Sequence, residues 1–197
     1  LDRFNARQNA DNFTLDSLEK ACAYAHLRGV KVYITMNTLI LDDEMRDACA
    51  LIRQAWQRGA DAFIVQDLGL AAHVVQMLPP EALHVSTQMN IHSVDGLLAA
   101  ADLGAERITL ARELSVEEIA NLCAVGREAG VTCEVFAHGA ICVCYSGQCL
   151  MSSLIGGRSA NRGLCAQACR LPYHLVRRDA PERELRAPGE FLLSPKD

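Results

Sequence analysis

Residues 42–66, DDEMRDACALIRQAWQRGADAFIVQ, contain the unit from which the rest of the chain is built. Residues 42–58 predict a helix, and Gly59 ends it because glycine tolerates the left-handed conformation found after helices. The short apolar run 62–66 is rich in β-branched and aromatic residues and predicts a buried strand. A polar loop then leads to the next helix. The pattern is therefore helix, glycine, short strand and polar loop.

The same unit recurs on both sides of this stretch. Thr14 is expected to cap a first helix that Gly29 ends, and Ser115 with Glu118 forms a capping box for a later helix that Gly130 ends. Helices are also predicted over 68–77 and 93–103. Strands are predicted over 30–37, 62–66, 83–88, 107–111 and 131–137.

This alternation predicts parallel strands joined by right-handed helical crossovers. An open doubly wound sheet and a (β/α)8 barrel both satisfy it. No GxGxxG motif or P-loop follows any strand, and the short strands end in polar residues, so we favour a TIM-like parallel (β/α) barrel. Five strands fall short of eight, and the chain begins at Leu1 without a Met. We therefore expect residues 1–197 to be one incomplete barrel-type domain of a longer protein.

Polar residues stand where the predicted strands end. In a barrel these ends meet at the carboxyl face, where catalytic groups sit. Each residue has an ordinary alternative as a strand-end cap. Together they predict a ring that hydrogen-bonds a polar planar substrate, such as a base or a carboxylic acid. The ring comprises Asn37, Gln66, Asp67, Gln88, Asn90, Arg112, Glu113, Glu134 and His138.

A cysteine-rich segment, 138–170, follows the fifth strand and holds five of the nine cysteines. Six residues separate Cys142 from Cys149, fifteen separate Cys149 from Cys165, and three separate Cys165 from Cys169. Zinc sites favour close cysteine pairs in both halves, whereas irregular spacing among Gly and Ser suits an iron–sulfur cluster. We favour the cluster. A zinc site and a metal-free loop remain open alternatives.

The composition is that of a soluble globular protein, with 50% hydrophobic and 22% charged residues. No apolar run is long enough for a membrane span. The other four cysteines fall inside helix or strand patterns and are expected to be small buried side chains. The odd cysteine count favours a reducing, cytoplasmic compartment. Those four are Cys22, Cys49, Cys123 and Cys133.

The net charge of −5 conceals an uneven distribution. Residues 150–186 contain seven Arg, no Lys and three acidic residues. The tail segment 171–197 is therefore either a site for phosphate or another anion, or a solvated and poorly ordered stretch.

The cysteine segment resembles the signature of the collagenase-like peptidase family, peptidase family U32. The match runs through EVFAHGAIC at 134–142 and, after four residues, GQCLMS at 147–152. Further blocks that look like this family are FNAR at 4–7, NT at 37–38, QDLG at 66–69, STQ at 86–88, LAREL at 110–114, NRG at 161–163 and LSPKD at 193–197.

The resemblance implies two different activities. Some family members are described as collagenases or proteases. Others are iron–sulfur-dependent, oxygen-independent hydroxylases of tRNA uridine or rRNA cytidine, with prephenate as the apparent oxygen donor, or of a ubiquinone precursor. By resemblance Cys142, Cys149 and Cys165 are ligands of a cluster, expected to be [4Fe–4S]. The fourth ligand is Cys169 or a cysteine beyond residue 197, and Cys144 is a bystander.

The residues favour the hydroxylase. No H-E-x-x-H, G-x-S-x-G or aspartic dyad motif is present, although Cys142 with His138 remains an alternative cysteine nucleophile. His138 is either a proton donor or substrate contact, or only a donor to a cluster sulfur or to the backbone, and Glu134 is either functional or structural. We expect a cytoplasmic RNA-base hydroxylase. Its candidate catalytic residues are His138, Glu134, Arg112 and Glu113, and its candidate substrate-binding residues are Asn37, Gln66, Asp67, Gln88 and Arg162.

Overall fold

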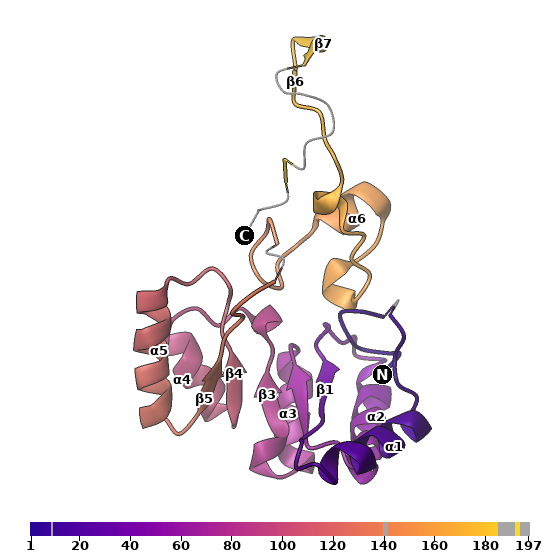
Figure 1. Cartoon of the computed structure of the whole chain (residues 1–197), viewed down its shortest axis with the longest axis vertical. Helices are drawn as coiled ribbons and strands as arrows, with labels where there is room; N and C mark the ends of the chain where they lie inside the picture. The colour runs from indigo at the N-terminus through magenta and orange to yellow at the C-terminus, as the bar shows by residue number, and fades with distance from the viewer. Residues whose placement is uncertain (9, 140–141, 185–191, 194–197) are drawn as a thin grey trace.

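The computed structural model describes residues 1–8, 10–139, 142–184 and 192–193. Five parallel strands form its centre, and helices pack against them (Figure 1). The helices are α1 (Leu15–His26), α2 (Met45–Gln57), α3 (Leu68–Met77), α4 (Val94–Asp102), α5 (Val116–Glu128) and α6 (Met151–Gly156). The strands of this sheet are β1 (Tyr33–Met36), β2 (Ala62–Val65), β3 (Leu83–Val85), β4 (Arg107–Thr109) and β5 (Thr132–Glu134).

The strands are hydrogen-bonded in the order β1-β2-β3-β4-β5, and every pair is parallel. The predicted α/β class and parallel pairing are confirmed. The predicted closed barrel is not confirmed, because the sheet formed by the described residues has two open edges, at β1 and β5. Its order also does not reverse, as the order of a doubly wound sheet does at its switch point.

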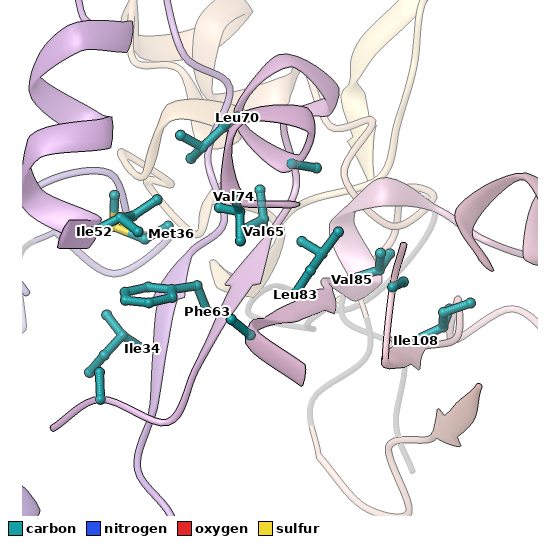
Figure 2. Packing of buried hydrophobic residues seen from close by; sticks show 14 of the residues in the cluster. Ile34, Met36, Ile52, Phe63, Val65, Leu70, Val74, Leu83, Val85 and Ile108 are labelled. Carbon is teal, nitrogen blue, oxygen red and sulfur yellow. The ribbon is translucent and has the colours of Figure 1, made fainter. Parts of the chain in front are cut away.

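One face of the sheet is apolar and carries the core. Phe63 and Val65 of β2 alternate with residues of the other face, as do Leu83 and Val85 of β3. They pack on helix residues such as Leu70 of α3, and all are almost completely buried (Figure 2). The helices therefore cover this face.

The helix starts follow their sequence signals. The Thr14 side chain accepts from the Ser17 N–H at the start of α1, and Ser115 with Glu118 makes the predicted capping box of α5. Gly29 and Gly130 follow α1 and α5 with φ of 68° and 76°. These positive angles explain why glycine stands at both helix ends.

The strands are shorter than predicted. The run expected to end at residue 88 leaves the sheet after Val85, because the Ser86 hydroxyl accepts the Gln88 N–H and turns Thr87–Met89 into a 3-10 helix, η2. The strand predicted over 131–137 is β5, only three residues long. The runs 30–37 and 107–111 similarly contribute only β1 and β4.

The cysteine segment and the tail are more regular than predicted. The segment contains α6, which ends where Gly157 adopts φ of 64°, and two 3-10 helices, η3 (Ala160–Arg162) and η4 (Ala168–Arg170). In the tail, β6 (Val176–Arg177) and β7 (Ala180–Glu184) form an antiparallel hairpin that projects away from the sheet (Figure 1). Residues 185–191 and 194–197 of the predicted tail lie outside the described residues.

Within the part of the chain that the structure describes, no helix combines the length and apolar character that a bilayer crossing requires.

Candidate metal centre

The cysteine segment is anchored to the carboxyl end of the sheet through Ser146, which lies between Cys144 and Cys149. Ser146 is completely buried. Its N–H donates to Glu113 Oε1 at 2.9 Å, and its hydroxyl lies 3.2 Å from both oxygens of that carboxylate. Arg112 Nε donates to the Ser146 hydroxyl at 3.2 Å. The two predicted catalytic residues that follow β4 therefore position the loop.

Gly147 brings the same loop against the backbone of η2. Its φ is 70°, and a Cβ added to it would lie 1.9 Å from the Gln88 carbonyl oxygen. No other residue fits at this position unless the loop or the segment around Gln88 moves. Gln88, a predicted substrate-binding residue, therefore contacts the cysteine segment through its main chain.

A second anchor holds the segment further along, at η3. The Arg162 guanidinium donates to both oxygens of Glu44, at 2.7 and 2.9 Å, and to the Leu39 carbonyl at 3.2 Å. The Leu39 N–H donates to the Asn161 carbonyl at 3.1 Å. The hydrogen bonds from Arg162, and then the one from the Leu41 N–H, lower the pKa of Glu44 to about 2. The predicted substrate-binding Arg162 thus fixes the segment to the loop between β1 and α2.

Two other strand-end residues hold neighbouring loops. Asn37 Oδ1 accepts the Ala6 N–H at 3.0 Å. Asp67 caps α3 by accepting the Leu70 N–H at 2.9 Å, and its other oxygen accepts the Ile40 N–H at 3.2 Å. These hydrogen bonds give Asn37 and Asp67 a structural role at the carboxyl end of the sheet. Their contact with a substrate stays a prediction.

The remaining predicted residues lie apart from these anchors. Gln66 is buried, and its Oε1 has no hydrogen-bond partner among the described residues. Glu134, in β5, lies 3.5 Å from both Arg107 Nη1 and the Thr109 hydroxyl. His138 is exposed, just after β5 and four residues before Cys142. Ala140 and Ile141 of the motif lie outside the described residues.

The cysteines of the segment gather near one another. Burial, followed by contact with the Cys149 thiol and the proximity of Cys142 and Cys169, raises the pKa of Cys144. The predicted bystander Cys144 therefore lies among three of the predicted ligands. All nine cysteines are free thiols.

Two hydrogen-bond donors lie near the sulfur of Cys165. Its sulfur accepts the Gln167 N–H at 3.4 Å and lies 4.0 Å from the Ser152 hydroxyl. Ser152 is itself buried, and its hydroxyl accepts the Ala166 N–H at 3.0 Å. Donors placed on a sulfur stabilise a thiolate and tune the potential of an iron–sulfur cluster.

The chemistry of the donor set is compatible with an iron–sulfur cluster. No group of three or more His, Cys, Asp or Glu among the described residues is arranged to hold one metal ion. Soft thiols with N–H and O–H donors beside them suit iron and sulfide. The residues that fit this role are Cys142, Cys149, Cys165 and Cys169, with Cys144 close by.

The other cysteines pack against the body of the domain. Cys22 is buried, as predicted, whereas Cys49, Cys123 and Cys133 are only partly buried. Burial raises the pKa of Cys22 and Cys49. Burial, and then the neighbouring Cys123, raises the pKa of Cys133 to about 11. The thiols of Cys22, Cys49 and Cys133 are therefore poor nucleophiles.

Sequence reasoning missed a polar group on the sheet itself. His84 of β3 is 4% exposed, and its ring centroid lies 4.6 Å from that of Tyr33. Burial, and then the charges of Arg107 and Lys31, lowers the pKa of His84 to about 4. The signal that could have revealed His84 is its position between two apolar residues of a short buried strand, where a polar side chain is unusual.

Comparison with known proteins places these features in context. The model of peptidase family U32 matches residues 1–197. The 23S rRNA 5-hydroxycytidine C2501 synthase of Escherichia coli is 45% identical over 87% of this chain and 25% of its own length. The tRNA hydroxylation protein P1 of Bacillus subtilis is 31% identical over 98% of the chain and 46% of its own. A collagenase of Porphyromonas gingivalis is 33% identical over 96% and 47%. The chain thus spans a quarter to about half of the length of these relatives.

Proposed function

We propose that this chain, which belongs to peptidase family U32, carries part of the active site of an iron–sulfur enzyme that hydroxylates a base of RNA. The relatives that modify rRNA and tRNA support the substrate class. The proposed position of the active site rests on one structural observation. The loop between Cys142 and Cys149 is seated on the carboxyl end of a parallel sheet through Ser146, Arg112 and Glu113.

We infer that the sheet is an arc of a (β/α) barrel. Its order follows the sequence without a reversal, which is the order of strands in a barrel. Right-handed crossovers between successive strands place every connecting helix on one face. The other face is then the lumen, and the cysteine segment lies at its mouth. Active sites of such barrels occupy this end.

Cys142, Cys149, Cys165 and Cys169 would hold the cluster. When bound, a cluster supplies an electron-transfer centre beside the substrate. The chain's own residues then have separate tasks. Ser152 and the Gln167 N–H keep the Cys165 sulfur oriented. His138 is exposed four residues before Cys142, and its imidazole can pass a proton between solvent and a substrate.

Hydroxylation replaces a C–H bond of the base by C–OH, which adds one oxygen atom and removes two electrons from the base. An oxygen-independent enzyme needs a donor other than O2 that both releases the oxygen atom and accepts those two electrons, and we propose prephenate in this role by family resemblance. The arginines of residues 150–186 supply positive charge for the RNA backbone. An RNA substrate places this activity in the cytoplasm.

A protease is the second candidate, because a relative over nearly the whole chain is named a collagenase. In that case Cys142 would be the nucleophile and His138 its base, and Cys149 and Cys165 would be dispensable. Hydroxylation of a ubiquinone precursor is the third candidate.

Nucleoside mass spectrometry of total RNA from a deletion strain tests the proposal. We expect one hydroxylated pyrimidine to disappear, to return with the wild-type gene, and to stay absent with Cys149→Ala. Unchanged nucleosides, together with gelatin cleavage that survives Cys149→Ala and Cys165→Ala, would establish the protease instead. A loss of ubiquinone intermediates with intact RNA would select the third candidate.

A further inference from the structure

Phe136 presents an exposed aromatic ring between β5 and the cysteine segment. It stands two residues after the end of β5, where the chain leaves the carboxyl end of the sheet (Figure 1). Phenylalanine ranks among the side chains most often buried in folded proteins. Phe136 is nevertheless 59% exposed. Its ring is therefore available for contact with a ligand beside the candidate metal centre.

The Arg112 guanidinium lies next to this ring. Its central carbon is 5.9 Å from the centroid of Phe136. The Leu110 N–H donates to the Glu134 carbonyl at 2.9 Å, so the chains that leave β4 and β5 stay side by side. Arg112 and Phe136 each stand two residues beyond that hydrogen bond. Because Nε of Arg112 also donates to the Ser146 hydroxyl at 3.2 Å, the guanidinium is held beside the ring.

An exposed aromatic ring with a guanidinium beside it has the chemistry that binds nucleic-acid bases. Every base has a flat π face, which packs on an aromatic ring or on the planar guanidinium of arginine. The cation is attracted to such π faces, and its charge also favours the RNA backbone. A purely apolar protein surface would gain nothing from the cation. The pair of Phe136 and Arg112 therefore fits an unpaired base of RNA better than an apolar protein partner.

The location of the pair agrees with what the proposed reaction requires. An enzyme that modifies a base must take it out of the stack of its neighbours, and the lost stacking has to be replaced by contacts with the protein. Phe136 stands six residues before Cys142. Arg112 holds the loop between Cys142 and Cys149 through Ser146. A base that stacks on Phe136 would thus lie where the cysteine segment begins.

We propose that Phe136 and Arg112 form a stacking platform that receives an unpaired base of the RNA substrate. This proposal rests on the proposed action on an RNA base and assigns the positioning of that base to Phe136. Stacking tolerates any base, because every base has a π face. The platform therefore holds pyrimidines of either kind and leaves the discrimination between them to other groups.

Fluorescence anisotropy with the whole protein, purified without oxygen, tests the platform. The labelled probes are decacytidylate, decauridylate and a ribose-phosphate chain of the same length without bases. Phe136→Ala should weaken the binding of decacytidylate and of decauridylate about tenfold each, because one stacked base is lost. Binding of the chain without bases should stay unchanged. Phe136→Leu, which is apolar but not aromatic, should behave like Phe136→Ala, whereas Phe136→Trp should bind at least as tightly as the wild type.

Tyr24→Ala is the matched control. Tyr24 is 63% exposed, and the guanidinium carbon of Arg28 lies 3.6 Å from its ring centroid. It therefore has the same chemistry as Phe136, but it stands near the end of α1, which leads into the start of β1 at the opposite end of the sheet. Tyr24→Ala should bind all three probes as the wild type does. Unchanged binding of the chain without bases, with an unchanged thermal unfolding curve, shows that the Phe136 variants are folded.

Three results would overturn the platform: wild-type affinity of Phe136→Ala or Phe136→Leu for both probes with bases, an equal loss for the chain without bases in a folded variant, or no binding of either pyrimidine probe by the wild type. The nucleoside analysis separates these results from a failure of the proposed function. A protein that hydroxylates RNA without using Phe136 refutes only the platform. A protein that binds bases through Phe136, but whose deletion leaves all nucleosides unchanged, refutes only the hydroxylase.

Discussion

The position of the cysteine segment depends on two small neighbouring residues, Ser146 and Gly147. Ser146 supplies both a main-chain and a side-chain donor to the carboxylate of Glu113. Gly147 has no side chain, which lets the loop lie directly against the Gln88 carbonyl. Neither residue has the chemistry of a ligand, but together they determine where the cysteines on either side are held.

Replacing Gly147 by Ala should dislodge this loop. The new methyl group would overlap the Gln88 carbonyl oxygen, and φ of 70° adds backbone strain of about 1–3 kcal/mol. We expect the variant to lose most of its bound iron while the sheet stays folded, as measured by iron content and thermal unfolding. Gly156→Ala is the control, because nothing lies within 4 Å of its added Cβ. Full iron occupancy in Gly147→Ala would refute the anchoring role.

The cysteines should divide into two reactivity classes. In cluster-free native protein at pH 8, the exposed Cys142 and Cys165 should be alkylated first. Cys22 and Cys133 should react much more slowly, because burial raises the pKa of both thiols, that of Cys133 to about 11. Peptide mass spectrometry over a time course measures both classes. Labelling of Cys133 as fast as Cys165 would contradict the raised pKa of the Cys133 thiol.

Among the elements, η3 links the cysteine segment to the loop that precedes α2. The bidentate contact between Arg162 and Glu44 is the strongest part of that link, because a paired carboxylate and guanidinium hold two parallel hydrogen bonds. Gly163 lets the chain turn against the Asn5 carbonyl directly afterwards. The segment is thus held at two separated points on the same end of the sheet.

The link between Arg162 and Glu44 should weaken at acid pH. The pKa of Glu44 is lowered from 4.5 to about 2 in the folded protein. Its contribution to stability is therefore complete above about pH 4.5 and is lost as pH falls toward 2. We expect Glu44→Gln to cost about 1 kcal/mol at pH 7, after solvent screening, and almost nothing at pH 2. Urea unfolding of both proteins at several pH values measures this, and an equal cost at both ends would contradict the role of the ion pair.

Across the whole molecule, positive charge is concentrated beyond the sheet. The β6–β7 hairpin projects from the cysteine segment and carries Arg177 and Arg178 (Figure 1). The Arg177 guanidinium is paired with Asp179. Arg178 lies in the exposed turn between the strands. An RNA held at the mouth of the sheet could reach this hairpin with its backbone.

Arg178→Ala should therefore weaken RNA binding without changing base preference. Loss of one phosphate contact lowers the slope of log affinity against log salt by about 0.7 for single-stranded RNA. Anisotropy titrations with decacytidylate at several salt concentrations measure that slope. Arg127→Ala on α5 should leave it unchanged. An identical slope for Arg178→Ala and wild type would remove the hairpin from the RNA interface.

The sequence predicted the elements well because their signals are local. The caps at Thr14 and Ser115 and the glycines after the helices depend only on neighbouring residues. Strand lengths were overestimated, because a strand ends where its partner leaves it, as β3 does when Ser86 turns the chain. The predicted closure of the sheet is not seen, because β1 and β5 are open edges among the described residues.

The candidate ligands could be singled out in the sequence by their spacing and by the family resemblance, whereas the residues that support the segment could not. These candidates are Cys142, Cys149, Cys165 and Cys169, and their role as ligands stays a prediction. The work of Arg112, Glu113 and Arg162 in holding the segment depends on contacts across more than thirty residues of sequence, such as Ser146 with Glu113. No local pattern reveals those contacts. The polar face around His84 was hidden for the same reason, since strand register decides which residues meet.

The central claim is that the cysteine segment holds an iron–sulfur cluster at the carboxyl end of the sheet. Its most direct test is the iron and acid-labile sulfide content of protein purified without oxygen. We predict about four of each per chain, with loss of both in Cys149→Ala and Cys165→Ala and full retention in Cys22→Ala. One zinc per chain without sulfide, or iron that survives both cysteine replacements, would contradict the claim.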